Sequence, residues 1–477
     1  FDSLPYWPQT MPSPTTIPAN TLDDQFVAAR ALLDEILLVP GFQKLFDLND
    51  RPNTKMVYTQ SITIWLSILQ RLRGGASLSS VVSEAVNYQN DIFPENKRAR
   101  EGTLSENTGT FSRARKRLLR STIEEFSRKV CDYLGKTAEP VLDNRRVFII
   151  DGTTITLPPT ACLKKEFPPA TNQHGESVWP VALLTVAAEL QSGCILVPKI
   201  DPMYGPNNSS EAKQTHEIVT ELPSNSIVLA DSNFGIDSVA HHTKQAGNDF
   251  LLRLTLSHFR SYRNKADLVD QGKGYKSYHL KWIPTHKERQ NNPDIPNDSS
   301  LEVFIHEFQL PSGKMLPLIT SLQLDAHCLA ELYRRRYDVE FDIRDLKVTM
   351  DAENIRAKSL DTFEKEFMGS VIAYNLVSQV RRSAAKLAKV PPRRLSFSGV
   401  WLSFKDHLLR RKCETVEEWR FAFSQMLVSA SKRKLPVRKE PRDYPRIAHP
   451  RRQKSTKYQK SLRNNKTATQ APRLAIK

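Results

Sequence analysis

Three carboxylates occur where the chain could bind a divalent cation. Asp151 interrupts the apolar run VFII, and Asp231 follows the apolar run IVLA. Burying a charge is unfavourable, so two apolar strands that each end in aspartate indicate that both carboxylates have a function. A single such aspartate could instead be a turn residue or a helix cap. Together with Glu340 they offer the oxygen ligands that Mg²⁺ prefers. Two such ions can activate a water or a 3′-hydroxyl and stabilise the leaving oxygen in phosphoryl transfer. The sequence therefore predicts Asp151, Asp231 and Glu340 as catalytic metal ligands for two Mg²⁺ ions, which Mn²⁺ can replace.

The glutamate lies in a cationic stretch, ELYRRRYDVEFDIRDLK, at residues 331–347. At about 100° per residue on a helix, four side chains fall within a sector of about 60°: Tyr333, Arg336, Glu340 and Lys347. Arg344 lies at the edge of the same sector. An amphipathic helix would place apolar residues along such a seam. The alternative is a surface helix with Arg336–Glu340–Arg344 ion pairs, each of which contributes little.

The elements that must position these residues follow from the hydrophobic periods. From residue 146 the order is strand, strand, strand, helix, strand, helix, strand, which predicts a mixed α/β sheet with carboxylates at two strand ends. Residues 256–320 are polar and strand-like and predict a small β insertion. Helical spacing resumes at 325–349 and at 361–388. The fold class is therefore α/β, with helices on both faces of the sheet.

Helical spacing before residue 140 predicts an all-helical N-terminal domain. The helix pair predicted over about residues 108–134 carries several cationic side chains in its first half. We assign Arg113, Lys116 and Arg117 to DNA binding. Two short helices of which one is densely cationic resemble a helix-turn-helix arrangement. The alternative is a solvated basic helix face.

The charge distribution supports a polyanionic partner. The chain has 69 Lys+Arg and 52 Asp+Glu, a formal charge of +17. Residues 431–477 hold 16 Lys+Arg and 2 Asp+Glu, which leaves 53 against 50 for the first 430 residues. Most of the excess therefore belongs to the tail, whose expected role is general affinity for phosphate.

Several classes of protein are disfavoured. No phosphate-wrapping GxxxxGK[ST] string occurs, which argues against an NTP-driven motor. No apolar run approaches the roughly 18 residues that a membrane span needs, so no membrane partner is expected. The N-terminus has no signal-peptide pattern, and the five cysteines form no CxxC, which fits reduced thiols in a bacterial cytoplasm and offers no zinc site.

The motifs together resemble the bacterial DDE transposases of insertion sequence family four. The family's signature of Tyr, two residues, Arg, three residues, Glu, six residues, Lys is matched at every interval by Tyr333, Arg336, Glu340 and Lys347. The similarity extends to IDGTTITLP around Asp151, to YGPNNSSEAKQTHEIVTELPSNSIVLADSNFG, and to AYNLVSQVRRSAAKLA, and it covers about residues 105–400. It implies an RNase H-like catalytic domain that carries a β insertion.

The resemblance also implies roles for single residues. Asp151, Asp231 and Glu340 would be the metal triad. The cations Arg336, Arg344 and Lys347, together with Tyr333, would hold the DNA backbone. Trp282 would stack on an extruded base, or alternatively would cover one face of a small sheet. The chain departs from many relatives at Ser232, where they have Arg, and at Tyr337, where they have Trp.

The expected division of the chain is a loose lead-in at 1–21, a helical DNA-binding domain at 22–140, a catalytic domain in two parts at 141–255 and 321–410, the β insertion at 256–320, a C-terminal helix at 411–430, and a basic, disordered tail at 431–477. The resemblance implies cut-and-paste transposition through terminal inverted repeats and target DNA, with a hairpin intermediate, by a homodimer associated with the nucleoid. The alternatives are a decayed transposase acting as a DNA-binding regulator, and an RNase H-like nuclease or junction resolvase.

Overall fold

The computed structural model describes residues 56–87, 96–142, 144–172, 175–310, 313–409 and 416–436, all within one compact unit. The predicted lead-in, the helical spacing before residue 56 and the tail beyond residue 436 lie outside the described residues. Among the helices that are described, none combines the length and apolar character that a membrane crossing requires.

A ten-stranded mixed sheet is the centre of the fold, with the order β2-β3-β1-β5-β6-β10-β9-β8-β7, and β4 pairs with β3. Its strands are β1 (Val147–Thr156), β2 (Pro169–Asn172), β3 (Gly175–Glu189), β4 (Lys199–Pro202), β5 (Ile227–Ala230), β6 (Asp249–Arg253), β7 (Asp267–Gly272), β8 (Tyr275–Trp282), β9 (Leu301–Gln309) and β10 (Met315–Thr320). Strands β1, β5 and β6 are parallel, and the other pairs are antiparallel. The predicted mixed α/β sheet is confirmed.

Alternate residues of the central strands enter two separate cores. In β1, Val147 and Ile149 belong to the larger core, whereas Phe148 and Ile150 belong to the smaller one. This alternation follows from the two-residue period of a strand, and a strand buried on both faces has an apolar run without polar interruption. The run VFII ends at Asp151, so this carboxylate is the first charge that the strand carries out of the core.

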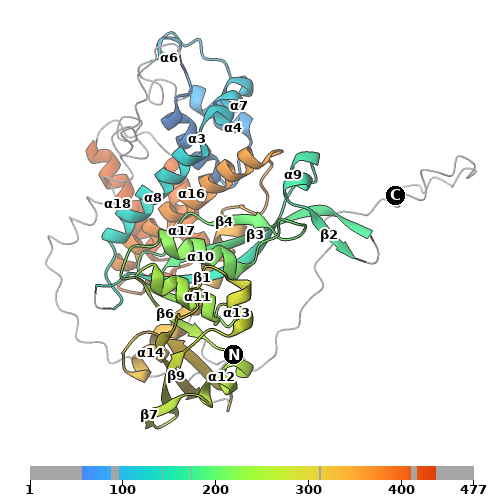
Figure 1. Ribbon diagram of the computed structural model, residues 1–477. Helices are drawn as coiled ribbons and strands as arrows, with labels where there is room; N and C mark the ends of the chain where they lie inside the picture. Colours follow the sequence, from blue (N-terminus) through green and yellow to red (C-terminus); the bar gives the residue numbers. More distant parts are fainter. Residues whose placement is uncertain are drawn as a thin grey trace, which may run out of the picture. The chain divides into compact units, whose positions relative to one another are not determined.

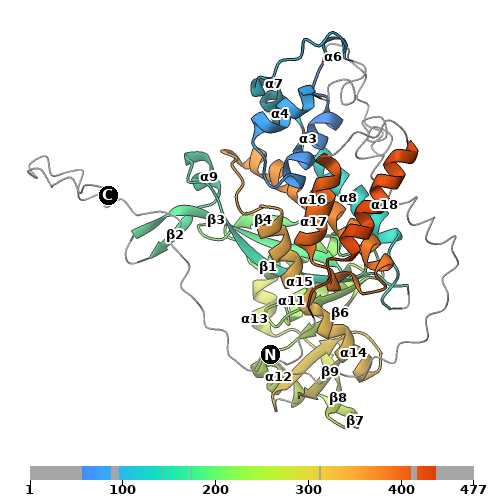
Figure 2. The same ribbon diagram turned by 180° about the vertical axis from the view of Figure 1, so that it is seen from behind.

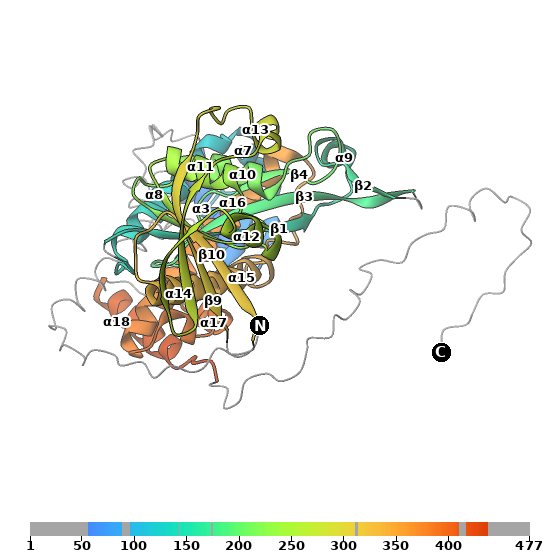
Figure 3. The same cartoon turned by 60° about the horizontal axis from the view of Figure 1, so that its bottom comes forward.

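Helices cover both faces of the sheet. On the side of the smaller core lie α10 (Glu211–Glu221) and α11 (Asp237–Gln245), while α15 (Asp338–Arg344) packs on the opposite side, as Figure 3 shows. Shorter helices accompany the sheet: α9 (Ala161–Glu166), α12 (Leu256–Arg263), α13 (His286–Asn291) and α14 (Ala326–Arg334).

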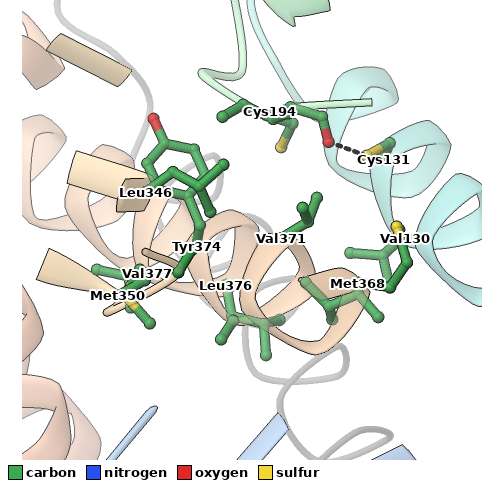
Figure 4. Close-up of a cluster of buried hydrophobic side chains, with 14 of the residues drawn as sticks. Val130, Cys131, Cys194, Leu346, Met350, Met368, Val371, Tyr374, Leu376 and Val377 are labelled. Atoms are coloured by element: carbon green, nitrogen blue, oxygen red, sulfur yellow. Dashed lines mark hydrogen bonds between the residues drawn. The ribbon is translucent and has the colours of Figure 1, made fainter. Parts of the chain in front are cut away.

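The long helix α16 (Leu360–Leu387) is the axis of the larger core. The N-terminal helices α3 (Gln60–Leu72) and α8 (Arg120–Lys136) pack against it (Figure 1). Figure 4 shows Tyr374 of α16 beside Leu346, and Met368 of the same helix beside Val130 of α8. The remaining helices are α4 (Leu78–Asn87), α6 (Lys97–Arg100), α7 (Thr108–Arg117), the 3₁₀ turn η3 (Pro392–Arg394), α17 (Phe397–Leu409) and α18 (Val416–Ser431). The N-terminal helices thus share a core with the segment around Leu346.

The predicted β insertion is not a separate small sheet. Strands β7 to β10 extend the central sheet, because β10 pairs with β6 through Leu318↔Arg253, Ile319↔Leu252 and Thr320↔Leu251. The core behind the central strands therefore continues beneath these outer strands and includes their apolar residues.

Candidate active site

The signature segment is built from four short helical pieces. Helix α14 is followed by the 3₁₀ turn η1 (Arg335–Tyr337), by α15, and by the π-helical turn η2 (Asp345–Thr349). A 3₁₀ turn is tighter and a π turn wider than an α-helical turn, so the angle per residue is not constant along the segment. The segment is therefore not one regular α-helix, and Tyr333 is 4% exposed while the Glu340 side chain is 52% exposed.

Arg336 connects the glutamate to the sheet. Its Nη2 donates a hydrogen bond of 2.8 Å to Oε1 of Glu340, and its Nη1 lies 3.8 Å from Oδ2 of Asp151. The guanidinium is 7% exposed and lies 4.3 Å from the ring centre of Tyr337. Helix α15 rests beside β1 (Figure 2), so this arginine holds two of the three predicted carboxylates near one another.

The two aspartates leave the same end of neighbouring strands. Strands β1 and β5 are parallel, with Ile150 opposite Ala230, and each aspartate is the next residue. Oδ1 of Asp151 accepts the backbone N–H of Gly152 at 2.9 Å, and Oδ1 of Asp231 accepts a backbone N–H at 2.8 Å. Burial raises the pKa of Asp151 to about 6, against the lowering effect of the Gly152 N–H and Arg336. A carboxylate pair at the carboxyl edge of parallel strands is therefore present.

A further glutamate, which the sequence did not single out, faces this pair. Glu211 begins α10, and burial followed by the charge of Asp231 raises its pKa. The side chain of Asn233 lies close to it and acts against this rise in pKa. The residue lies inside a segment used for the family resemblance, but a glutamate in the first turn of a helix is common because it complements the helix dipole. A single sequence does not distinguish a glutamate that complements the helix dipole from one that faces the aspartate pair.

These residues suit a hard divalent cation. Among the residues that the structure describes, no three or more His, Cys, Asp or Glu side chains form a ready-made metal site. The donor set is nevertheless entirely carboxylate oxygen, and the absence of a Cβ on Gly152 leaves room for the Glu211 carboxylate beside Asp151. Asp151 and Asp231 are the residues that would hold the ion, while Glu340 is bound to Arg336 in this conformation.

The last signature residue, Lys347, is turned toward the sheet. Its Nζ donates to Oγ1 of Thr153 at 3.2 Å and to the carbonyl of Thr154 at 3.0 Å, and it lies 3.2 Å from the carboxylate of Glu353. Arg344 differs, because its side chain is 60% exposed and lies over the ring of Phe341. Of these two cations, Arg344 is the one that this conformation offers to a ligand.

Residues 143–376 match the family model described as the transposase DDE domain. This match assigns residues 143–376 to the transposase DDE domain family. The predicted resemblance to insertion sequence family four is confirmed by this match and by a curated relative, the transposase InsG of insertion sequence element IS4 from Escherichia coli (strain K12). That relative is 24% identical over 293 residues, which is 60% of this chain and 64% of the relative, just under two thirds of its length. Membership implies a divalent metal ion as cofactor.

Among solved structures, the chain is similar to the piggyBac transposase in a synaptic complex with hairpin DNA. The TM-score is 0.37 and the identity 9%, over 84% of this chain and 85% of that one.

Two other groups of predicted DNA-binding residues differ in exposure. On α7, Arg113, Lys116 and Arg117 are exposed, while Phe111 and Ala114 are buried on the other side of the helix. Trp282 in β8 is 2% exposed, and its ring centre lies 5.3 Å from that of Tyr262. This placement fits the alternative that Trp282 covers a sheet face, since stacking on a base would require the side chain to leave the core.

Proposed function

We propose that this chain catalyses cut-and-paste transposition of an insertion sequence. The observation that carries the proposal is the carboxylate arrangement, in which Asp151 and Asp231 end adjacent parallel strands and Arg336 joins Asp151 to Glu340. The strand order β3-β1-β5-β6, with α10 and α11 between successive strands of the chain, supports an RNase H-like catalytic domain.

The reaction has two chemical steps. In the first, water attacks a phosphodiester at the transposon end and the 3′-oxygen leaves as a hydroxyl. In the second, that 3′-hydroxyl attacks a phosphodiester of target DNA, so one phosphodiester forms as another breaks. Two bound Mg²⁺ ions would activate the attacking oxygen and stabilise the leaving one, and Mn²⁺ would replace them.

The protein's own groups position the substrate. Asp151, Asp231 and Glu340 would bind the ions, and Arg336 fixes the distance between the glutamate and the sheet. The exposed guanidinium of Arg344 would bind a backbone phosphate beside the site, a contact that gives position and salt-dependent affinity without reading sequence. Lys347 holds η2 against β1.

Other parts of the chain would bind DNA away from the reaction. The exposed cations of α7 would contact the terminal inverted repeats, within a helical DNA-binding region at 22–140, and the basic residues at 431–477 would add general affinity. Synapsis of two ends requires a homodimer or a larger assembly. In this proposal the excised DNA passes through a hairpin intermediate. The protein associates with the nucleoid.

Cleavage of DNA that carries the ends of the element tests the proposal. With Mg²⁺, the full chain is expected to nick at the end and leave a 3′-hydroxyl, and Asp151→Asn, Asp231→Asn or Glu340→Gln is expected to abolish the nick. The matched control is Glu331→Gln, which removes a glutamate of the same segment whose side chain is 61% exposed and pairs only with Arg334 among the described residues. Cleavage that survives all three substitutions would refute the metal triad, and a wild-type chain that binds ends without cutting would favour a decayed regulator.

A further inference from the structure

Glu211 occupies a defined position at the start of α10. Oγ of Ser210 caps the helix by accepting the N–H of Lys213 at 3.2 Å. One turn into the helix, the amide of Gln214 accepts a hydrogen bond of 2.5 Å from Oγ1 of Thr185 and donates one of 3.2 Å to the carbonyl of Leu183. These buried contacts attach α10 to β3, so the first residue of the helix has little freedom to move away from the sheet.

Gly152 leaves the space that the glutamate uses. A Cβ on Gly152 would overlap the Glu211 carboxylate and would lie only 2.6 Å from its Cγ. The backbone of Gly152 is not in the left-handed region, so any residue could adopt its conformation. Glycine is therefore required here for space rather than for conformation. Gly152 directly follows the metal-binding candidate Asp151. Its missing side chain leaves the space in which the Glu211 carboxylate approaches the strand ends.

The loop after β5 lies beside both Asp231 and Glu211. The backbone N–H of Asn233 donates to Oδ1 of Asp231 at 2.8 Å, and the side chain of the same asparagine lies close to Glu211. In the described part of the chain, neither of these carboxylates forms an ion pair with Lys, Arg or His. Three carboxylates thus share one end of the sheet, with Arg336 near Asp151 as the compensating charge. Such an excess of negative charge is unfavourable until a cation binds.

We propose that Glu211 is a further carboxylate of the divalent-cation site, supplying charge and hydrogen-bond acceptors beside Asp151 and Asp231, with Gly152 as the opening that admits it. This inference rests on the proposed function, because it concerns the same metal site. A Mg²⁺ ion held through one or two carboxylates keeps several waters, which further oxygen acceptors can bind. On the face of α15, Glu340 is held by Arg336, whereas Glu211 approaches from the α10 side of the sheet.

Binding of Mn²⁺ alone to the full chain, measured by calorimetry without DNA, tests the inference. Glu211→Gln keeps the size of the side chain but removes its charge and replaces one acceptor oxygen with an NH₂ donor, and we expect the dissociation constant to rise by about 10- to 100-fold. The matched control is Glu217→Gln on the same helix, whose side chain is 58% exposed and pairs with Lys199. Equal affinity of wild type and Glu211→Gln would overturn the inference.

A double-mutant cycle with Gly152 separates a specific contact from a general disturbance. Gly152→Ala is expected to weaken Mn²⁺ binding because its methyl group displaces the Glu211 carboxylate. In a Glu211→Ala background the same substitution should have little further effect, since the clash is gone. Independent losses that simply add would contradict the proposed contact. Melting temperatures of the four proteins establish that each is folded when binding is measured.

A third variant distinguishes failure of this inference from failure of the proposed function. Asp151→Asn is expected to abolish Mn²⁺ binding. If Asp151→Asn loses binding while Glu211→Gln keeps it, only the role of Glu211 is wrong. If the wild type does not bind Mn²⁺, or binds it as well as Asp151→Asn does, the metal site of the proposed function fails as well.

Discussion

At the scale of single residues, burial determines what each carboxylate of the site can do. Asp151 is partly withdrawn from water and has Arg336 at 3.8 Å, whereas Glu340 is half exposed and bound to the same arginine at 2.8 Å. The desolvated aspartate pays a cost for its charge that a bound cation would offset. The half-exposed Glu340 carboxylate loses little hydration and can exchange Arg336 for another partner.

The raised pKa of Asp151 predicts an effect of pH on stability in the absence of metal. The pKa is about 6 in the folded chain and about 3.9 in an unfolded one, so between these values the folded state binds more protons. The free energy of unfolding therefore falls as pH rises from about 4 to about 6. Asp151→Asn should be more stable than wild type at pH 7.5, by about 1–3 kcal/mol, and nearly equal to it at pH 4.

Thermal melts at the two pH values, with a chelator present, measure this difference. Asp132→Asn is a control, because that side chain is 59% exposed and its removal should change little. A gain for Asp151→Asn that is the same at pH 4 and at pH 7.5 would show that the charge of Asp151 is not its cause.

Residue-level prediction from the sequence was possible where a side chain interrupts a pattern. Asp151 and Asp231 stand out because each ends an apolar strand, and the structure places them at adjacent strand ends. Glu211 could not be found, since its spacing is that of an ordinary helix start. The inward direction of Lys347 and the burial of Trp282 depend on tertiary contacts with Thr153 and Tyr262, which no local pattern contains.

At the scale of elements, a buried ion-pair network shapes the signature segment. Asp342 is fully buried and accepts a hydrogen bond from Arg393 of η3, while Arg381 of α16 lies 3.9 Å from both Asp342 and Asp345. The other guanidinium nitrogen of Arg393 lies 3.4 Å from Asp338. These contacts attach α15 to two distant segments on the side away from Glu340. These ion pairs join residues that are far apart in the sequence, and they lie beside the 3₁₀ and π turns. Helical periodicity alone predicts neither the pairs nor the turns.

Breaking this network should destabilise the fold. Asp342→Ala leaves Arg393 and Arg381 without their buried partner, and we expect the free energy of unfolding to fall by about 3–5 kcal/mol. Glu125→Ala, which removes an acid that is 63% exposed and pairs with Lys129, itself 42% exposed, should cost less than about 1 kcal/mol. Thermal or urea unfolding compares the two. Equal losses would mean that the network contributes no more than a surface pair.

At the scale of the whole molecule, charge and chemistry are separated along the chain. The catalytic candidates lie in the first 430 residues, which are nearly balanced in charge, while the excess lies in residues 431–477. The fold class was predictable because strand and helix periods differ strongly. The joining of the insertion strands to the central sheet was not, because the pairing of β10 with β6 is a long-range contact.

Deletion of residues 437–477 tests the role assigned to the basic end. That segment holds 13 Lys+Arg and 2 Asp+Glu. Removing it should weaken binding to end DNA and to unrelated DNA by the same factor, and should reduce the dependence of binding on salt, because fewer counterions are released. Titrations with both DNAs at several salt concentrations measure these effects. Selective loss of end binding would show that the tail reads sequence.

The joining of a pre-cleaved transposon end to a supercoiled plasmid tests the central claim most directly. The account predicts that the full chain, with Mg²⁺, links the 3′-hydroxyl of the end covalently to plasmid DNA, and that Asp151→Asn, Asp231→Asn and Glu340→Gln each abolish the product. Linking that persists in these variants, or a wild-type chain that only hydrolyses the plasmid without joining the end to it, would contradict the assignment of these carboxylates to transposition.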